Sequence, residues 1–308
     1  QRLQKGQRAS SQYVVNYWHQ VWYCMIRGFQ RVKGDSTYTK VYLSSFLIKG
    51  LIVGSLFHRI DDKSQSTTKG AYSRGGMLFY VLLFASVTSL AEIANSFATR
   101  PIIVKHKSYS MYHLSAESLQ EILTEFPVKF VAVLTLSLVT YWIPFMKYTA
   151  GAYFQYLLYL ITVQQCTSFI FKSVATLTKD GATAHALGGL WVLILCIYAG
   201  FVLPLREMHH WIKWIHWLNP LSYAFESLVS TEFHGRQMKC SALVPSGPGY
   251  ENISIANQVC DSPGAIKGHE FVGGDAYIKA QYHYDYSHAW RNGGINVVWT
   301  FVYIWFNV

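Results

Sequence analysis

The sequence predicts an all-α membrane protein with six transmembrane helices. Of the 308 residues, 51% are hydrophobic and only 14% are charged, whereas soluble globular proteins carry about 25% charged residues. Aromatic residues make up 16% of the chain, and their amphipathic rings favour the two bilayer interfaces. The apolar residues gather in six runs, at 41–57, 77–97, 128–145, 153–171, 183–202 and 294–308.

Residues 1–40 predict a cytoplasmic lead-in that contains an amphipathic connecting helix. Between residues 13 and 33, aromatic side chains alternate with Arg27, Arg31 and Lys33. A basic, aromatic helix of this kind lies on the surface of an anionic leaflet.

The membrane part is expected to begin with five transmembrane helices within 41–202. A sixth helix occupies 293–308, and its apolar run is cut at Val308. The chain also starts without Met, at Gln1. We therefore expect a truncated sixth helix and a longer parent protein.

Segment 203–233 predicts a re-entrant pair of short helices after the fifth span. Tryptophans recur at helical spacing, and Asn219 and Pro220 suit the N-cap and first position of the second helix. Each helical piece has about 12–13 residues, or ~18–20 Å, which is too short for a hydrocarbon core of about 30 Å. The alternative is an aromatic belt that lies flat at the interface. The tryptophans are Trp211, Trp214 and Trp217.

The distribution of Lys and Arg places the N-terminus in the cytoplasm. The predicted cytoplasmic pieces, 1–40, 98–127 and 172–182, hold 12 of these residues, against five in the short outer loops. Because the basic residues lie in loops between apolar runs, membrane orientation explains the net charge of +10, and we expect no nucleic-acid partner.

The same orientation makes the long loop 203–292 extracellular, with 234–292 as its part beyond the helix pair. Asn252 lies in a glycosylation sequon there. Cys240 and Cys260 share the loop and could form a disulfide, which an oxidising compartment would preserve.

Motifs for catalysis and metal binding are missing from the sequence. His209 and His210 stand without the further histidine boxes that a metal-dependent membrane enzyme needs. The sequence also has no nucleophile elbow and no phosphate-binding loop. We therefore expect no catalytic residue, metal or cofactor in this chain.

Six motifs keep a fixed order and spacing across roughly residues 15–308. They are RVKGD at 31–35, RPI at 100–102 with KHKSYSMY at 105–112, YAGFVLP at 198–204, NPLSYAFE at 219–226, EFHGR at 232–236 and PSGPGY at 245–250. Together they resemble the first transmembrane domain, of ABC-2 type, of a fungal pleiotropic-drug-resistance ABC transporter of the G subfamily.

The resemblance implies a full-size transporter in the plasma membrane, with two nucleotide-binding domains and two transmembrane domains in one polypeptide. ATP and Mg²⁺ would be bound by nucleotide-binding domains outside this sequence. Their closure would switch a central cavity between inward- and outward-facing states and expel amphipathic compounds. The implied partners are these nucleotide-binding domains, the second transmembrane domain, the lipid bilayer and small amphipathic substrates.

The resemblance also implies roles for individual residues. The cavity wall would include positions on the second and fifth spans, although each side chain could instead face lipid or a neighbouring helix. Contact with a nucleotide-binding domain would fall to the connecting helix and the loop after the second span. The cavity positions are Phe84, Val87, Thr88, Val192, Leu193 and Cys196, and the coupling positions are Arg100, Lys105, His106 and Tyr109.

The helix pair would form the outer gate. Glu226 and Glu232 could bind cationic groups there, but a structural role through hydrogen bonds is favoured. Val104 and Leu114 depart from the family, which usually has Glu and Pro at these positions, so an acidic contact at this junction is in doubt. The gate positions are Asn219, Pro220, Tyr223, Glu226 and Glu232.

Two local features carry further expectations. Lys49 lies in the first span, where an ionised side chain is costly, and Glu92 is its nearest acidic candidate for pairing. Ser115 is expected to cap a short helix that ends before Pro127.

Two glycine pairs are expected to allow close helix packing. They are Gly75 with Gly76 and Gly188 with Gly189.

Three functions remain open from the sequence. The first is the membrane half of an ATP-driven exporter of amphipathic xenobiotics. The second is a lipid or weak organic acid translocase with the same fold. A polytopic membrane enzyme is the third, and the missing catalytic motifs argue against it.

Overall fold

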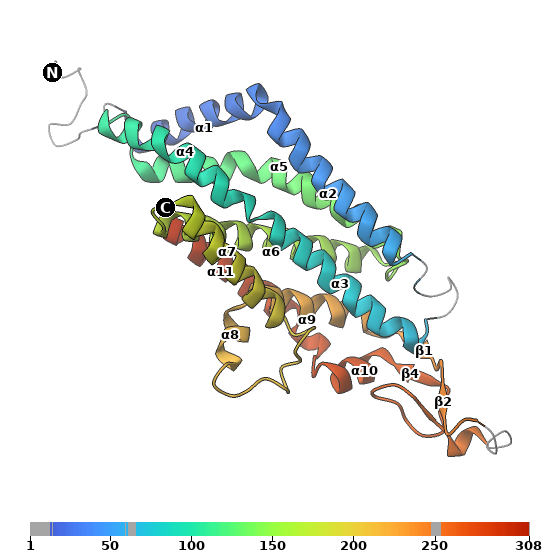
Figure 1. Ribbon diagram of the computed structural model, residues 1–308. Coiled ribbons are helices and arrows are strands. Elements are labelled where there is room, and N and C mark those ends of the chain that lie inside the picture. Colours follow the sequence, from blue (N-terminus) through green and yellow to red (C-terminus); the bar gives the residue numbers. More distant parts are fainter. Residues whose placement is uncertain (1–12, 14, 59, 61–65, 248–253, 308) are drawn as a thin grey trace.

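The computed structural model describes residues 13, 15–58, 60, 66–247 and 254–307. Eight longer helices form an elongated bundle, and a small strand-containing loop region covers one end of it (Figure 1). The longer helices are α1 Tyr17–Gly34, α2 Ser36–Leu56, α3 Thr68–Thr88, α4 Ala91–Ser108, α5 Leu114–Trp142, α6 Ala150–Leu177, α7 Gly181–Ile197 and α11 Ala289–Asn307.

The loop end of the bundle holds the shorter elements, including the 3-10 helices η1 and η2. Strands β1 and β4 pair antiparallel, as do β2 and β3. The shorter elements are α8 Lys213–Leu218, α9 Pro220–Phe233, β1 Gln237–Lys239, β2 Leu243–Val244, η1 Ile255–Asn257, β3 Val259–Cys260, β4 Phe271–Gly273, α10 Gly274–Gln281 and η2 Tyr286–His288.

Four helical segments among the described residues are long and apolar enough to cross a membrane. They are Ser36–Leu56, Thr68–Ser108, Leu114–Trp142 and Ala150–Leu177. The predicted fifth span corresponds to the shorter apolar helix Gly181–Ile197. The chain is thus a mostly helical, multi-pass membrane protein, with fewer clear spans than the six predicted from apolar runs.

The second predicted span, 77–97, is interrupted. Helix α3 ends at Thr88 and α4 begins at Ala91, with a tight turn at Ser89 and Leu90. Hydrogen bonds from side-chain hydroxyls hold the turn, since Ser89 Oγ lies 3.0 Å from Thr167 Oγ1 on α6. Mean hydropathy does not register such a turn, because the whole segment Thr68–Ser108 stays apolar on average although Ser86, Thr88 and Ser89 lie at the turn.

The prediction of a short helix that ends before Pro127 is wrong. Helix α5 runs without interruption from Leu114 to Trp142, with Pro127 inside it. Its N-cap is His113, whose Nδ1 accepts from the Ser115 backbone N–H at 3.2 Å. A proline removes one helical hydrogen bond but does not end a helix that neighbouring helices hold in place.

The predicted length of the first helix in the re-entrant pair is also wrong. Only Lys213–Leu218 is helical, and the chain from Gly200 to Ile212 forms turns and bends. Gly200 has a positive φ of 98°, and a Cβ there would lie 2.3 Å from the Tyr284 hydroxyl. The second member, α9, is helical as predicted, and all of its residues except Glu226 are buried.

Glycines set the close approaches between helices. A Cβ on Gly28 of α1 would lie 2.3 Å from Gln120 Oε1 of α5. A Cβ on Gly188 of α7 would lie 2.6 Å from Ile93 Cδ1 of α4, whereas nothing lies within 4 Å of the same position on Gly189. Only one member of this predicted glycine pair therefore serves close packing.

The other predicted glycine pair lies on α3. A Cβ on Gly75 would lie 2.8 Å from the Tyr282 hydroxyl, and one on Gly76 would lie 3.3 Å from the Phe201 ring. Both glycines thus face the chain at the loop end of the bundle rather than another transmembrane helix.

Candidate functional site

A cluster of buried and partly buried ionisable side chains lies where α4, α5 and α6 meet. We call it the ion cluster, and Lys129 and Lys172 are its basic members. Lys129 Nζ lies 2.9 Å from Glu92 Oε1 and 2.7 Å from Glu125 Oε2. Lys172 Nζ lies 2.7 Å from the same Glu125 oxygen and 3.4 Å from Glu121 Oε1. The cluster thus joins three helices through shared carboxylates.

Burial makes the ion cluster a strong constraint on the bundle. The side chains of Glu92, Lys129 and Lys172 are 3%, 5% and 7% exposed. Removing one partner of such a buried pair leaves an uncompensated charge, at a cost of about 3–5 kcal/mol. The positions of α4, α5 and α6 relative to one another are therefore tightly specified.

The ion cluster corrects the expected pairing of Lys49 with Glu92. Glu92 contacts Lys129 and Lys172 instead. The Lys49 ammonium donates to the Thr88 hydroxyl at the end of α3 and lies 5.4 Å from the centre of the Phe46 ring. A hydroxyl oxygen and the face of an aromatic ring thus stabilise this intramembrane ammonium group, where a carboxylate was expected.

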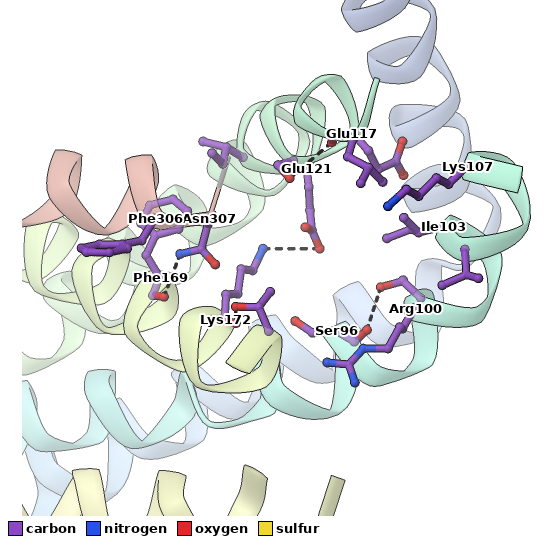
Figure 2. Close-up of a pocket in the computed structure, with 16 residues that line it drawn as sticks. Ser96, Arg100, Ile103, Lys107, Glu117, Glu121, Phe169, Lys172, Phe306 and Asn307 are labelled. Carbon is purple, nitrogen blue, oxygen red and sulfur yellow. Dashed lines mark hydrogen bonds and ion pairs between the residues drawn. The ribbon is translucent and has the colours of Figure 1, made fainter. Parts of the chain in front are cut away.

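A cavity of about 440 Å³ lies beside the ion cluster (Figure 2). Arg100 and Lys107 line its α4 side, and Glu117 and Glu121 line its α5 side. In Figure 2 the Lys172 ammonium points toward the Glu121 carboxylate. Apolar side chains complete the lining, so the cavity combines charges of both signs with hydrophobic surface. The apolar residues are Ile103, Val104, Leu114, Ile122, Phe169 and Phe306.

Arg27 joins α1 to α5 and to the α4–α5 connection at the same end of the bundle. Its Nη2 lies 2.5 Å from Glu117 Oε2 and donates to the Tyr112 hydroxyl at 3.3 Å. Partial burial opposes the positive charge, but the Tyr112 hydrogen bond and the Glu117 carboxylate outweigh it, so the pKa of Arg27 is raised. His106 Nδ1 lies 2.8 Å from the same Tyr112 hydroxyl. We call these four residues the junction.

The predicted coupling residues differ in what they contact. Arg100 donates to the carbonyls of Ala175, Thr178 and Lys179 at 2.5, 3.0 and 3.2 Å, so it satisfies free carbonyl groups at the end of α6. His106 belongs to the junction. The side chains of Lys105 and Tyr109 are exposed on the end of α4.

The predicted cavity-wall residues lie on α3 and α7, which contact each other. Phe84, Val192 and Cys196 pack against the hydrophobic core. Leu193 is 59% exposed on α7. Thr88 is held by Lys49 and donates to the Phe84 carbonyl at 2.7 Å.

The predicted gate residues make internal contacts at the start of α9. Asn219 accepts from the Leu221 backbone N–H at 2.9 Å, as an N-cap does, and donates to the Leu195 carbonyl of α7 at 2.8 Å. Pro220 is the first residue of α9, and the Tyr223 hydroxyl donates to the Trp217 carbonyl. These bonds fix the turn between α8 and α9.

Glu232, near the end of α9, accepts three hydrogen bonds. Arg74 of α3 and Arg236 approach its Oε1 at 3.0 and 2.5 Å, and the Lys147 backbone N–H donates to its Oε2 at 3.0 Å. The Arg74 and Glu232 side chains are only 3% and 4% exposed. Glu226 contacts His288 and Asn292. Both glutamates therefore make structural contacts.

The loop end carries the predicted cysteine pair. A disulfide joins Cys240 and Cys260, whose Cα atoms are 5.7 Å apart. Asn252, the predicted glycosylation site, lies outside the described residues. Within the part of the chain that the structure describes, no group of three or more His, Cys, Asp or Glu side chains is placed to hold a metal ion.

The sequence analysis missed the ion cluster and the contacts of Arg27 with Glu117 and Tyr112, although it named His106 of the junction as a coupling residue. Glu117, Glu121, Glu125 and Lys129 recur every fourth residue, which places them on one face of a helix. Ending the expected helix before Pro127 separated Lys129 from the glutamates and hid this signal.

Comparison with protein families matches the chain along most of its length. Residues 19–233 match the model of the ABC-2 type transporter, and residues 244–308 match that of the CDR ABC transporter. The first of these regions contains all of the residues in the ion cluster and the junction.

Individual relatives come from fungi. The chain is 80% identical over 308 residues to the ATP-dependent permease PDR12 of Saccharomyces cerevisiae. This match covers 100% of this chain and 20% of the relative. It is 37% identical over 300 residues to the ABC multidrug transporter A-2 of Aspergillus fumigatus, covering 97% of this chain and 20% of that protein. It is 39% identical over 297 residues to the multidrug resistance protein CDR2 of Candida albicans, covering 96% and 20%. The chain thus spans about a fifth of the length of these relatives. It belongs to the ABC-2 type transporter family, as a transmembrane domain of a fungal pleiotropic-drug-resistance ABC transporter.

Proposed function

We propose that the chain is one transmembrane half of an ATP-driven pump that exports amphipathic drugs and other xenobiotics. The observation that carries the proposal is the match of 96% or more of the chain to relatives named as multidrug transporters or resistance proteins. The transport cycle would be alternating access, driven by ATP and Mg²⁺ in nucleotide-binding domains elsewhere in the full polypeptide.

We propose a six-span topology in the plasma membrane, with α7 and α11 as the fifth and sixth crossings. The N-terminus would lie in the cytoplasm and residues 203–292 outside. The distribution of Lys and Arg supports this orientation. The disulfide between Cys240 and Cys260 supports it as well, because such bonds persist in oxidising compartments.

The junction is the proposed contact surface for a nucleotide-binding domain. Arg27 and Glu117 hold α1 against α5, so a push on either element would move both. Lys105 and Tyr109 remain exposed beside them and would make the direct contacts. Arg100 would act indirectly, because it binds the end of α6 and would hold that end in position.

From the junction, motion would pass to the bundle through the ion cluster. Glu117 belongs to the junction and Glu121 to the ion cluster, and they lie one turn apart on α5. The ion cluster in turn holds α4, which continues through the tight turn into α3. A displacement of α5 would therefore reach the proposed cavity wall on α3.

The cavity wall itself would include the exposed side of α7. Leu193 is 59% exposed there, which leaves it free to meet a substrate or the second transmembrane domain. Its aliphatic side chain suits loose recognition of apolar compounds.

An export assay tests this function in cells that lack their own drug pumps. The full-length protein should lower the accumulation of several amphipathic drugs, and vanadate should abolish the effect. Leu193→Ala should change the relative resistance to these drugs by several-fold, because it alters the proposed cavity wall.

Leu187→Ala is the matched control for that assay. Leu187 is also on α7 and 42% exposed, but it lies six residues earlier and therefore on another face of the helix. It should leave the drug profile unchanged. If the full-length wild-type protein does not change the resistance of the cells to any of the drugs, drug export is contradicted and a lipid or weak-acid substrate is favoured.

A further inference from the structure

Two histidine–carboxylate pairs join α9 to the segment that follows the strands. His234 Nδ1, at the end of α9, lies 2.9 Å from Asp275 Oδ1 in the first turn of α10. His288 Nδ1, at the end of η2, lies 3.1 Å from Glu226 Oε1 in the middle of α9. Helix α9 contacts both α10 and η2 at the loop end of the bundle (Figure 1).

The His234 pair is supported from several sides. The Gly235 backbone N–H donates to Asp275 Oδ2 at 3.2 Å. The imidazole stacks on the Tyr286 ring, with the ring centres 3.8 Å apart and the planes 1° from parallel. The Lys147 ammonium donates to the His234 carbonyl at 2.7 Å. The ring is therefore held in place even before any charge is added to it.

Charged groups of both signs surround His234. Lys279 of α10 and Asp285 line a surface pocket together with the imidazole and Asp275. Glu232 lies two residues before His234 in the chain, but its Oε1 contacts Arg74 and Arg236. Asp275 is therefore the carboxylate in direct contact with the ring.

The His288 pair has its own set of neighbours. Glu226 Oε2 accepts from Asn292 Nδ2 of α11 at 2.8 Å, which leaves Oε1 for the imidazole. Arg291 follows on α11 and donates to the Asn292 side chain. Asp285, one turn before His288, accepts from Ser287, and these hydrogen bonds lower the pKa of Asp285. Asp285 thus stays ionised in mildly acidic medium and adds negative charge near His288.

We propose that these pairs are proton-binding sites that form an acid-strengthened clasp, in which protonation of His234 and His288 fastens residues 274–292 onto α9. A neutral imidazole can already donate a hydrogen bond to an ionised carboxylate. Protonation of the ring adds the attraction between opposite charges to that hydrogen bond. The proposal goes beyond the export function, because it does not depend on the compound that is moved.

The geometry gives the medium access to both rings. The His234 and His288 side chains are 45% and 40% exposed, so protons reach them from the solution that bathes the loop. Histidine side chains generally titrate between about pH 5 and 8. The ion pair exists only while an imidazole carries its proton, so the clasp is expected to be stronger at acidic pH than at neutral pH.

Hydrogen–deuterium exchange of the full-length protein in lipid nanodiscs tests the clasp. Peptides that cover 226–236 and 274–292 are compared at about pH 5.5 and about pH 7.5, after correction for the chemical exchange rate. In the wild type, exchange in both peptides should be slower at the acidic pH, by up to about fivefold, as expected for partly exposed ion pairs. An unchanged wild-type rate would overturn the proposal.

Variants separate the clasp from a general effect of pH. Asp275→Asn and Glu226→Gln keep an oxygen acceptor but remove the charge, so each should flatten the pH response of its own pair. His269→Gln is the control, because His269 is exposed on the same loop and should respond as the wild type does. A full pH response in both carboxylate variants, or a flattened one in His269→Gln, would contradict the clasp. Asp275 is 54% exposed, so Asp275→Asn tests its pair even if Glu226→Gln fails to fold.

Discussion

At the scale of single residues, the two lysines inside predicted spans have opposite surroundings. Lys129 contacts one buried and one partly buried carboxylate, whereas Lys49 contacts a hydroxyl and a ring. Lys129→Met should leave Glu92 and Glu125 undercompensated and lower stability by about 3–5 kcal/mol. Thermal unfolding of the full-length protein in detergent measures this loss.

Lys49→Met is the matched control for that measurement. It removes an intramembrane charge that contacts no carboxylate among the described residues, so no buried ion is left behind there. The unfolding temperature should stay close to the wild-type value. Equal losses for the two methionine variants would mean that the ion cluster has no special role in stability.

Residue roles could be predicted where local chemistry decides them. Asn219 caps α9 and Pro220 follows it, as their types and order indicate. Partners distant in the chain could not be predicted, because Glu92 had several basic candidates across the helices. Its pairing with Lys129 and Lys172 depends on how α4, α5 and α6 are rotated, which apolar runs do not specify.

At the scale of elements, two adjacent glycines on α7 provide a direct test of helix packing. A Cβ at position 188 would meet Ile93 and Leu90 of the α4 region at 2.6 and 2.9 Å, whereas one at position 189 would meet nothing within 4 Å. Alanine also favours a helix over glycine by about 1 kcal/mol at either site. Gly189→Ala should therefore stabilise the protein slightly.

Gly188→Ala should instead destabilise the protein, since overpacking costs about 1–3 kcal/mol and exceeds the gain in helix propensity. Chemical denaturation of both variants, followed by a common probe, compares them directly. A gain in stability for Gly188→Ala equal to that for Gly189→Ala would show that α7 does not pack closely on α4.

Element boundaries show where sequence patterns reach their limit. Helix α9 follows from its cap and its apolar residues. The continuation of α5 through Pro127 does not follow, because proline usually ends a helix in isolation. Neighbouring helices decide the outcome here, since the ion cluster holds residues on both sides of Pro127.

At the scale of the whole molecule, the junction and the loop region lie at opposite ends of the bundle (Figure 1). The ion cluster lies between the junction and α3, so the proposed coupling path runs along the bundle. Composition and motif order were sufficient to predict the family, because they sample the entire chain. The path itself depends on side-chain contacts among four helices and emerges only from the fold.

The most direct measurement is drug uptake into inside-out membrane vesicles that contain the full-length protein. The export proposal predicts that an amphipathic fluorescent drug accumulates in the vesicles with ATP and Mg²⁺, and that vanadate or omission of ATP prevents this. Accumulation at the same rate without ATP, or none with ATP for any amphipathic drug tested, would contradict the account.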